Sequence, residues 1–288
     1  MNYDQFVHRM TACVEEGVLP SETVEKHEIL KNNGVNGIGL SVRKKEDSIA
    51  PVIYLDEYYQ CFQQGEKVED LAMHLLSKSR TDLPAMDWDY QQFSDFQAVK
   101  GRIAYKLINW ERNEKLLKEI PHLEALDLAI VFYLMIPCKE VDCCSILIRN
   151  SHLEQWGIKI PELYRCARKN MPKLCPPVLK PLTEFIEEVS GERLEGDSLY
   201  ILTNENGIHG ASALLYPGMP KRIRELLGSN YYLLPSSVHE FLIVQEDPAL
   251  RAKNLIAMVG EVNATLIQKE ELLSDHIYHF NGYNITKI

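Results

Sequence analysis

Several features that identify a protein class are missing from this 288-residue sequence. The longest uninterrupted apolar run, Leu128–Pro137, has the length of a strand and is too short to span a bilayer. The first twenty residues mix acidic side chains with a short amphipathic pattern, which differs from the charged head and apolar run of a secretory signal peptide. These absences predict a cytoplasmic protein with no membrane partner.

Paired cysteines and clustered metal ligands are also missing. The seven cysteines are odd in number, contain no Cys-x-x-Cys pair and are irregularly spaced, so we expect reduced thiols. Cys138, Cys143 and Cys144 cluster without the second pair that a zinc site needs. His276 and His279 lie three apart in a predicted strand, on opposite faces. No phosphate-binding motif is present either, because the glycines of Asn204–Gly210 suit an ordinary strand-to-helix turn. The sequence predicts no metal and no cofactor.

The sequence has little positive charge overall. Its net charge of −10 argues against a general nucleic-acid binder, which normally has a basic face. Residues 159–180 are the exception, with six cationic side chains and Glu162 as the one acid. This basic stretch is typical of a solvated helix face, and docking of an acidic partner or a nucleic acid is the alternative.

What is present fits a globular protein with a large core. The apolar fraction of 45% and the charged fraction of 25% are average for such proteins, and disorder would need fewer apolar residues. Helical and strand periodicities alternate along the chain, so the expected fold class is α+β. We predict an N-terminal domain over residues 1–95 and a C-terminal domain over 96–288. Residues 81–94 would form the link, and residues 187–198 a surface loop.

The last ninety residues have the clearest order of elements. The pattern predicts strands at Leu199–Thr203, Tyr231–Leu234, Val238–Val244 and His276–Phe280. Helical stretches over 212–227 and 248–267 separate them, and the turn Pro235–Ser237 joins the middle two strands. This β-α-β-β-α-β order is that of a ferredoxin-like or split βαβ unit, which many unrelated functions use.

The tightest polar sequence is Ser236-Ser237-Val238-His239-Glu240. Nucleophilic catalysis needs a hydroxyl within reach of an imidazole that a third group orients. In extended backbone Ser237 and His239 share a face while Glu240 points to the other, so a full triad is not expected. A hairpin whose serines bond their own backbone explains the same residues.

Nine short phrases, spread over nearly the whole chain, carry a resemblance. They are Lys31–Val35, Ser48–Leu55, Lys106–Asn109, Leu126–Ile130, Tyr200–Asn204, Gly210–Pro217, Leu234–Glu240, Val262–Thr265 and Leu273–His276. With these phrases the chain resembles an uncharacterised family of proteins from gut-dwelling anaerobic bacteria. The resemblance implies a bacterial cytoplasmic protein of unknown function, and it brings no active site with it.

The polar residues of the C-terminal unit form one candidate site, for a ligand or a partner, if they cluster in space. The candidates are Asn204, His209, Ser212, Ser236, Ser237, His239, Asn263, Asp275 and His276. The leading hypothesis is a non-catalytic binding or regulatory protein that engages another protein, a second copy of itself or a small molecule. The alternatives are a hydrolase with His239 or His276 as base beside a serine, and a nucleic-acid-associated protein using residues 159–180.

Overall fold

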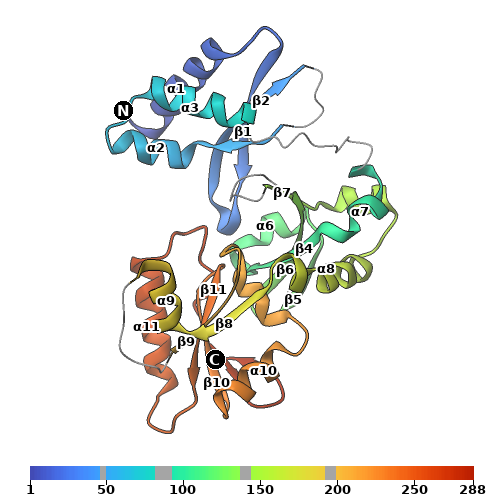
Figure 1. Ribbon diagram of the computed structural model, residues 1–288, viewed down its shortest axis with the longest axis vertical. Coiled ribbons are helices and arrows are strands. Elements are labelled where there is room, and N and C mark those ends of the chain that lie inside the picture. Colours follow the sequence, from blue (N-terminus) through green and yellow to red (C-terminus); the bar gives the residue numbers. More distant parts are fainter. Residues whose placement is uncertain (46–49, 82–92, 137–143, 192–198) are drawn as a thin grey trace. The chain divides into compact units, whose positions relative to one another are not determined.

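The computed structural model describes residues 1–45, 50–81, 93–136, 144–191 and 199–288, and its elements are labelled in Figure 1. Every strand pair whose register is described is antiparallel, so helices and antiparallel sheets make up an α+β protein, as predicted. None of the helices in these ranges has both the length and the apolar composition that a membrane crossing requires.

The chain folds into two compact units. The first comprises residues 1–31, 35–98 and 135–146, and the second comprises residues 32–34, 99–134 and 147–288. The main change of unit lies between Ala98 and Val99. The sequence gives no sign that Asn32–Gly34 and Met135–Ile146 would each join the other unit.

Two predicted connections fall largely outside the described residues. These are most of the link at 81–94 and the part of the loop at 192–198. Residues 187–190 of that loop are instead the last turn of helix α9 (Leu182–Ser190), which corrects the prediction. The helix continues because Phe185, Ile186 and Val189 keep its apolar spacing, and it ends at Gly191, whose φ of 75° suits a helix C-terminus.

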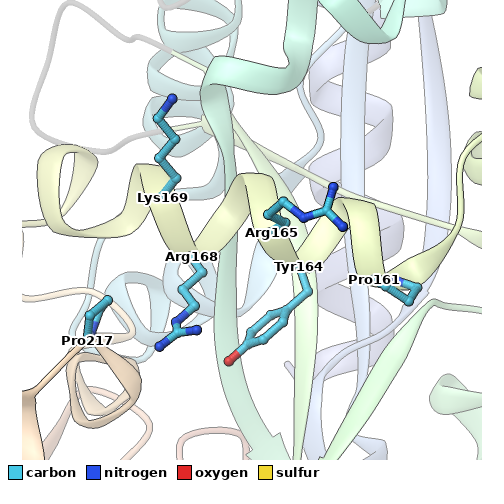
Figure 2. A pocket seen from close by; sticks show the side chains of 6 residues that line it. All are labelled: Pro161, Tyr164, Arg165, Arg168, Lys169 and Pro217. Atoms are coloured by element: carbon cyan, nitrogen blue, oxygen red, sulfur yellow. The ribbon is translucent and has the colours of Figure 1, made fainter.

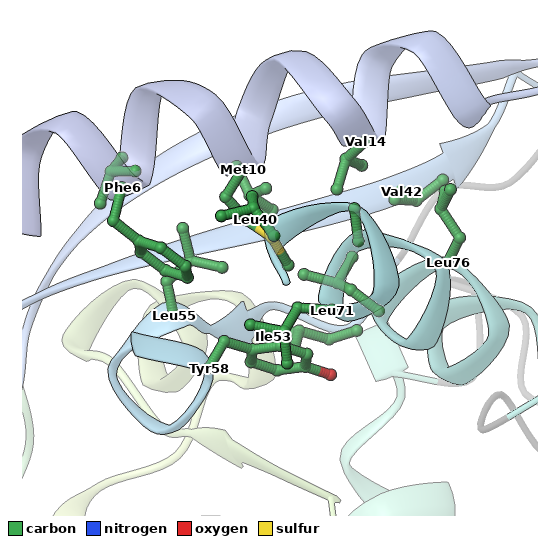
Figure 3. Close-up of a cluster of buried hydrophobic side chains, with 14 residues drawn as sticks. Phe6, Met10, Val14, Leu40, Val42, Ile53, Leu55, Tyr58, Leu71 and Leu76 are labelled. Carbon is green, nitrogen blue, oxygen red and sulfur yellow. The ribbon is translucent and has the colours of Figure 1, made fainter. Parts of the chain in front are cut away.

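The first unit packs three helices against a three-stranded sheet. Its elements are α1 (Tyr3–Gly17), β1 (Glu22–Leu30), β2 (Asn36–Lys44), β3 (Ile53–Tyr54), α2 (Leu55–Gln63), α3 (Val68–Thr81) and the start of α5 (Phe96–Val99). The side chains of Phe6, Met10 and Val14 repeat every fourth residue along α1 and are fully buried against the rest of this core (Figure 3). Asn2 and Gln5 form a capping box at the start of α1.

The second unit contains two sheets. Its larger sheet has the strand order β13-β12-β10-β11-β9-β8, and its smaller sheet has the order β4-β6-β5. The strands are β4 (Ile103–Asn109), β5 (His122–Ala125), β6 (Leu128–Ile136), β8 (Pro177–Pro181), β9 (Leu199–Asn204), β10 (Tyr231–Ser237), β11 (Glu240–Gln245), β12 (Tyr278–Phe280) and β13 (Ile285–Lys287). Strand β7 (Cys144–Leu147) belongs, except for Leu147, to the residues of the first unit.

Helices cover both sheets of this unit. The α-helices are α6 (Glu114–Leu117), α7 (Asn150–Trp156), α8 (Ile160–Leu174), α9, α10 (Met219–Leu227) and α11 (Ala252–Thr265). The 3₁₀ turns are η1 (Asn32–Gly34), η2 (Lys100–Arg102), η3 (Glu111–Asn113) and η4 (Gly210–Leu215). Helix α8 and turn η4 both pack against β4, and α11 packs on β10. Strand β4 therefore contacts both helix α8 and turn η4, which are distant from it in sequence.

The strand order of the larger sheet departs from a ferredoxin-like unit. The order of elements from β9 to β12 is the predicted one, and β9 and β10 are parallel with β11 inserted between them, as in a split βαβ unit. However, β12 pairs with β10, whereas a ferredoxin-like sheet would place β9 beside it. The ferredoxin-like order is thus not confirmed, because the hairpin β10–β11 occupies the middle of these four strands.

A buried network of three asparagines, Asn33, Asn109 and Asn113, lies within the second unit. The Asn113 Oδ1 atom accepts the backbone N–H of Asn33 at 2.8 Å, and Asn113 Nδ2 donates to Asn33 Oδ1 at 2.9 Å and to the Asn109 carbonyl at 2.8 Å. Asn33 Nδ2 donates in turn to the carbonyls of Lys269 and Leu272. Asn33 adopts a φ of 57°, a conformation that asparagine tolerates better than most residues. We call these three residues the asparagine network.

Candidate functional site

A lysine lies partly buried in the middle of an otherwise buried strand of the second unit. Lys106 interrupts the apolar pattern of β4, opposite Val131 of β6. Its Nζ atom lies 3.5 Å from Nε2 of His209. Among the described residues, no acidic side chain forms an ion pair with Lys106. Burial without such a partner disfavours the charged ammonium and lowers the pKa of Lys106 to about 8.

The loop between β9 and η4 places His209 against this lysine. His209 has a φ of 53°, and two side chains hold the backbone on either side of it. Asn204 Nδ2 donates to the Ile208 carbonyl at 2.9 Å, and Ser212 Oγ donates to the His209 carbonyl at 2.6 Å. The His209 ring also makes an edge-to-face contact with Tyr133, with ring centres 5.8 Å apart.

A second histidine stacks on the first. The rings of His209 and His239 are nearly parallel, with centres 5.8 Å apart, and the backbone N–H of His209 donates to His239 Nδ1 at 3.2 Å. On the other side of His239, Nε2 lies 3.6 Å from Glu271 Oε1. Burial, together with the positive charge of Lys106, lowers the pKa of His209 well below its ordinary value. His209 is therefore neutral at physiological pH. We call Lys106, His209, His239 and Glu271 the lysine–histidine group.

Gly210 allows the parts of this group to approach one another. A Cβ atom at this position would lie 2.2 Å from Thr203 Oγ1 and 2.4 Å from the His239 carbonyl oxygen. The Thr203 hydroxyl already donates to that carbonyl at 2.8 Å, which holds the His239 turn against β9. Only glycine fits here, because the main chains of two loops meet at this point.

Counting donors and acceptors shows which atoms remain available for chemistry. Both ring nitrogens of His239 face a partner, and the Lys106 ammonium has three N–H donors of which His209 takes one. Within the described residues, buried His209 Nδ1 and Asn204 Oδ1 have no hydrogen-bond partner. Leaving such atoms unpaired costs about 1–3 kcal/mol each, and exceptions of this kind call for an explanation. The two remaining N–H donors of Lys106 match the acceptor atoms of an anionic group.

Residues 3–282 of the chain match DUF5688, a family of unknown function. The chain belongs to this family. No curated protein and no solved structure matches it. All nine candidate residues from the sequence lie within the matched range.

In this DUF5688 protein the nine candidates separate into two groups and one single residue. Asn204, His209, Ser212, Ser237 and His239 lie around the lysine–histidine group. Asn263, Asp275 and His276 lie elsewhere: Asn263 donates to Asp275, which also accepts from Arg112 at 2.7 Å, and the His276 backbone N–H donates to Ser274. No side-chain contact of Ser236 is found in the described part of the chain.

The hydrolase alternative needs a serine hydroxyl at a histidine ring, and no hydrogen bond between Ser237 and the His239 ring is found among the described residues. Strand β10 continues through Ser237, so the hairpin turn is Val238–His239 and not Pro235–Ser237 as expected. The face argument, which assumed extended backbone through His239, is therefore wrong. Ser237 Oγ donates to Glu240 Oε1 at 2.9 Å and accepts the His239 backbone N–H at 2.9 Å. The hydroxyl is engaged by its own hairpin, as the simpler interpretation held.

The described residues also give no sign of a metal site. In the parts of the chain that the structure describes, no three His, Cys, Asp or Glu side chains converge as metal ligands would. Cys138 and Cys143 lie outside the described residues, as does the side chain of Cys144. His276 precedes β12 and His279 lies within it, near Glu246.

Sequence reasoning missed Lys106, Tyr133 and Glu271 as site residues. For Lys106 a signal existed, since one charge inside the apolar stretch Ile103–Ile108 of a predicted strand is unusual. Tyr133 and Glu271 had no comparable signal. Their neighbours in the fold are more than 30 residues away in sequence, and a single sequence does not show such contacts.

Proposed function

We propose that this chain is a cytoplasmic bacterial protein that binds a small anionic ligand, a carboxylate or a phosphate, without catalysing a reaction. The observation that carries the proposal is Lys106, a partly buried ammonium with no acidic partner among the described residues. The phrases shared with proteins of gut-dwelling anaerobic bacteria support an origin in that group.

The physical argument starts from the charge of Lys106. An ammonium group moved away from water loses hydration, and a nearby anion compensates for the loss more strongly there than it would in water. The neutral His209 ring accepts one N–H and leaves the other two for the ligand. A carboxylate or phosphate oxygen provides both the acceptor and the negative charge.

The same group offers little to an enzyme mechanism. A general base must reach its substrate with a free nitrogen or oxygen, and both ring nitrogens of His239 already face partners. Ser237 is held by Glu240. A binding role therefore fits the side chains better than a hydrolase does.

Thermal unfolding of the full-length protein at constant ionic strength tests the proposal. Inorganic phosphate, acetate and citrate are the probes. A bound anion stabilises the folded state, by about 2.7 kcal/mol at a concentration one hundred times its Kd. We expect at least one of these anions to raise the Tm of the wild type and to leave that of Lys106→Met unchanged.

Lys118→Met is the matched control, because Lys118 is exposed and its side chain has no described contact. It should keep the wild-type response. An equal rise of Tm in Lys106→Met, or no rise of the wild-type Tm with any of the three anions, would contradict anion binding at Lys106.

A further inference from the structure

Helix α8 lines an open pocket with one of its faces. Pro161, Tyr164, Arg165, Arg168 and Lys169 follow the i, i+3, i+4, i+7 and i+8 spacing of a single helix face. Together with Pro217 they surround a volume of about 420 Å³ (Figure 2). The opposite face, with Leu163, Ala167 and Met171, is buried in the second unit and fixes the helix in place.

Among the described residues, the cationic side chains of this pocket form no ion pairs. In the described ranges Arg165, Arg168 and Lys169 form no ion pair. Five arginines elsewhere in the described residues do form ion pairs with acidic side chains. The paired ones are Arg9, Arg43, Arg80, Arg112 and Arg149. Three unneutralised cations around one pocket produce a local positive potential on a chain whose net charge is −10.

The pocket also has an aromatic side. The Tyr164 ring is half-exposed and packs on two buried rings, Tyr105 at 6.1 Å and Phe132 at 6.4 Å between centres. Tyr105 also contacts Tyr216, which precedes Pro217 in the chain. Tyr105 is fully buried, and its hydroxyl has no partner among the described residues. Figure 2 shows the Tyr164 and Arg168 side chains directed to the same side of α8, while Lys169 extends to the other.

We propose that the α8 pocket binds a nucleoside phosphate, with the phosphate on Arg168 and the base against Tyr164. Guanidinium groups match phosphate oxygens in geometry and charge, and a tyrosine ring stacks on any base. The volume is within the range of pockets that hold small molecules. A long nucleic acid usually needs a more extended basic surface, so the acidic chain favours a free nucleotide as the source.

Isothermal titration of the full-length protein tests this pocket with AMP, ATP, adenosine, inorganic phosphate and a short single-stranded DNA. The wild type should bind AMP or ATP more tightly than adenosine or phosphate alone. Arg168→Ala should weaken nucleotide binding about tenfold or more, the loss expected for a charge-assisted hydrogen bond. Tyr164→Leu should reduce AMP affinity to that of phosphate, and Tyr164→Phe should restore it.

Two controls keep the test specific. Arg222→Ala removes an exposed arginine of α10 and should change nothing. Lys106→Met should also bind nucleotide as the wild type does, and a loss in that variant would assign the nucleotide to Lys106 and overturn the proposal. A cooperative thermal unfolding transition will show that each α8 variant folds.

The remaining outcomes identify the source of the nucleoside phosphate or reject the proposal. Affinity for the oligonucleotide no higher than for AMP, with a weak salt dependence, identifies a free nucleotide. A much higher and steeply salt-dependent affinity for the strand identifies a nucleic acid, which still occupies the pocket if Arg168→Ala weakens it. Equal effects of Arg168→Ala and Arg222→Ala, or no binding of any probe, would overturn the proposal.

Discussion

The asparagine network and the lysine–histidine group are two polar clusters in the same unit, and they differ in how completely their hydrogen bonds are made. In the asparagine network Asn113 makes three bonds, and Asn109 Nδ2 donates to the Leu273 carbonyl. In the lysine–histidine group an ammonium lacks a counter-ion and His209 Nδ1 lacks a partner within the described residues. Complete bonding is typical of a cluster that stabilises the fold, whereas incomplete bonding indicates a place that a ligand completes.

The largest expected effect comes from Gly210→Ala, which acts on the backbone of the lysine–histidine group. The added Cβ would collide with the Thr203 hydroxyl and the His239 carbonyl, and backbone cannot move aside as a long side chain can. We expect a loss of about 3 kcal/mol or more in the free energy of unfolding, measured with urea.

Gly260→Ala is the matched control, because Gly260 lies inside α11 with open space around its Cβ position. There the substitution should stabilise the protein by about 0.5–1 kcal/mol. Similar free energies of unfolding for the two variants would mean that the loops do not meet at Gly210 as described.

The next effect in size is expected for Asn113→Ala in the asparagine network. Removing this side chain leaves the Asn33 backbone N–H and the Asn33 carboxamide oxygen without their partners in a buried place. We expect a loss of about 2–3 kcal/mol in the free energy of unfolding by urea. Asn254→Ala, an exposed position of α11, should change it by less than about 0.5 kcal/mol. A small effect of Asn113→Ala would remove the distinction between the two clusters.

The smallest effect is expected for Lys106→Met, and it should depend on pH. The folded-state pKa of Lys106, about 8, lies below the ordinary 10.5, so the unfolded chain binds more protons between these values. Stability contributed by this lysine therefore rises as the pH increases through 8 and is lost as the pH falls below it. Lys106→Met should be as stable as the wild type or slightly more stable at neutral pH. At about pH 9 the stability of the wild type should increase relative to that of the variant.

The Tm difference between wild type and Lys106→Met at both pH values measures this effect. His209 contacts the lysine, and Tyr133, His239 and Glu271 lie next to it in the same cluster. All four are present in both proteins, which differ only at position 106. The Tm difference between the wild type and Lys118→Met should be the same at both pH values. A Tm difference that stays constant from pH 7 to about pH 9 would contradict the lowered pKa.

Sequence patterns predicted those parts of the fold that depend on neighbouring residues. The strand-length apolar run that begins at Leu128 contains β6, and the helical stretch predicted to end at residue 227 contains α10, which ends there. Pro161 begins a helix in the first-turn position. These signals are local, and the confirmed α+β class follows from them.

Strand order and site assembly depend on contacts that the pattern does not contain. The turn at Val238–His239 follows from a pairing irregularity between Pro235 and Ser237, which shifts the register of β10 against β11. Lys106 and His209 meet although 103 residues separate them. The residue pattern around Lys106 and the pattern around His209 contain no sign that the two side chains are in contact.

The asparagine network also has a consequence for the order of events during synthesis. Asn33 leaves the ribosome early, yet its side chain bonds to the carbonyl of Leu272, which is 239 residues later. Until Leu272 has been synthesised, the Asn33 side-chain amide must bind water or form other hydrogen bonds, because a loop of this length cannot close before both of its ends exist. The second unit therefore completes its interior only after residue 272 has been translated, and a nascent chain stalled before that residue should remain open to proteases at this point.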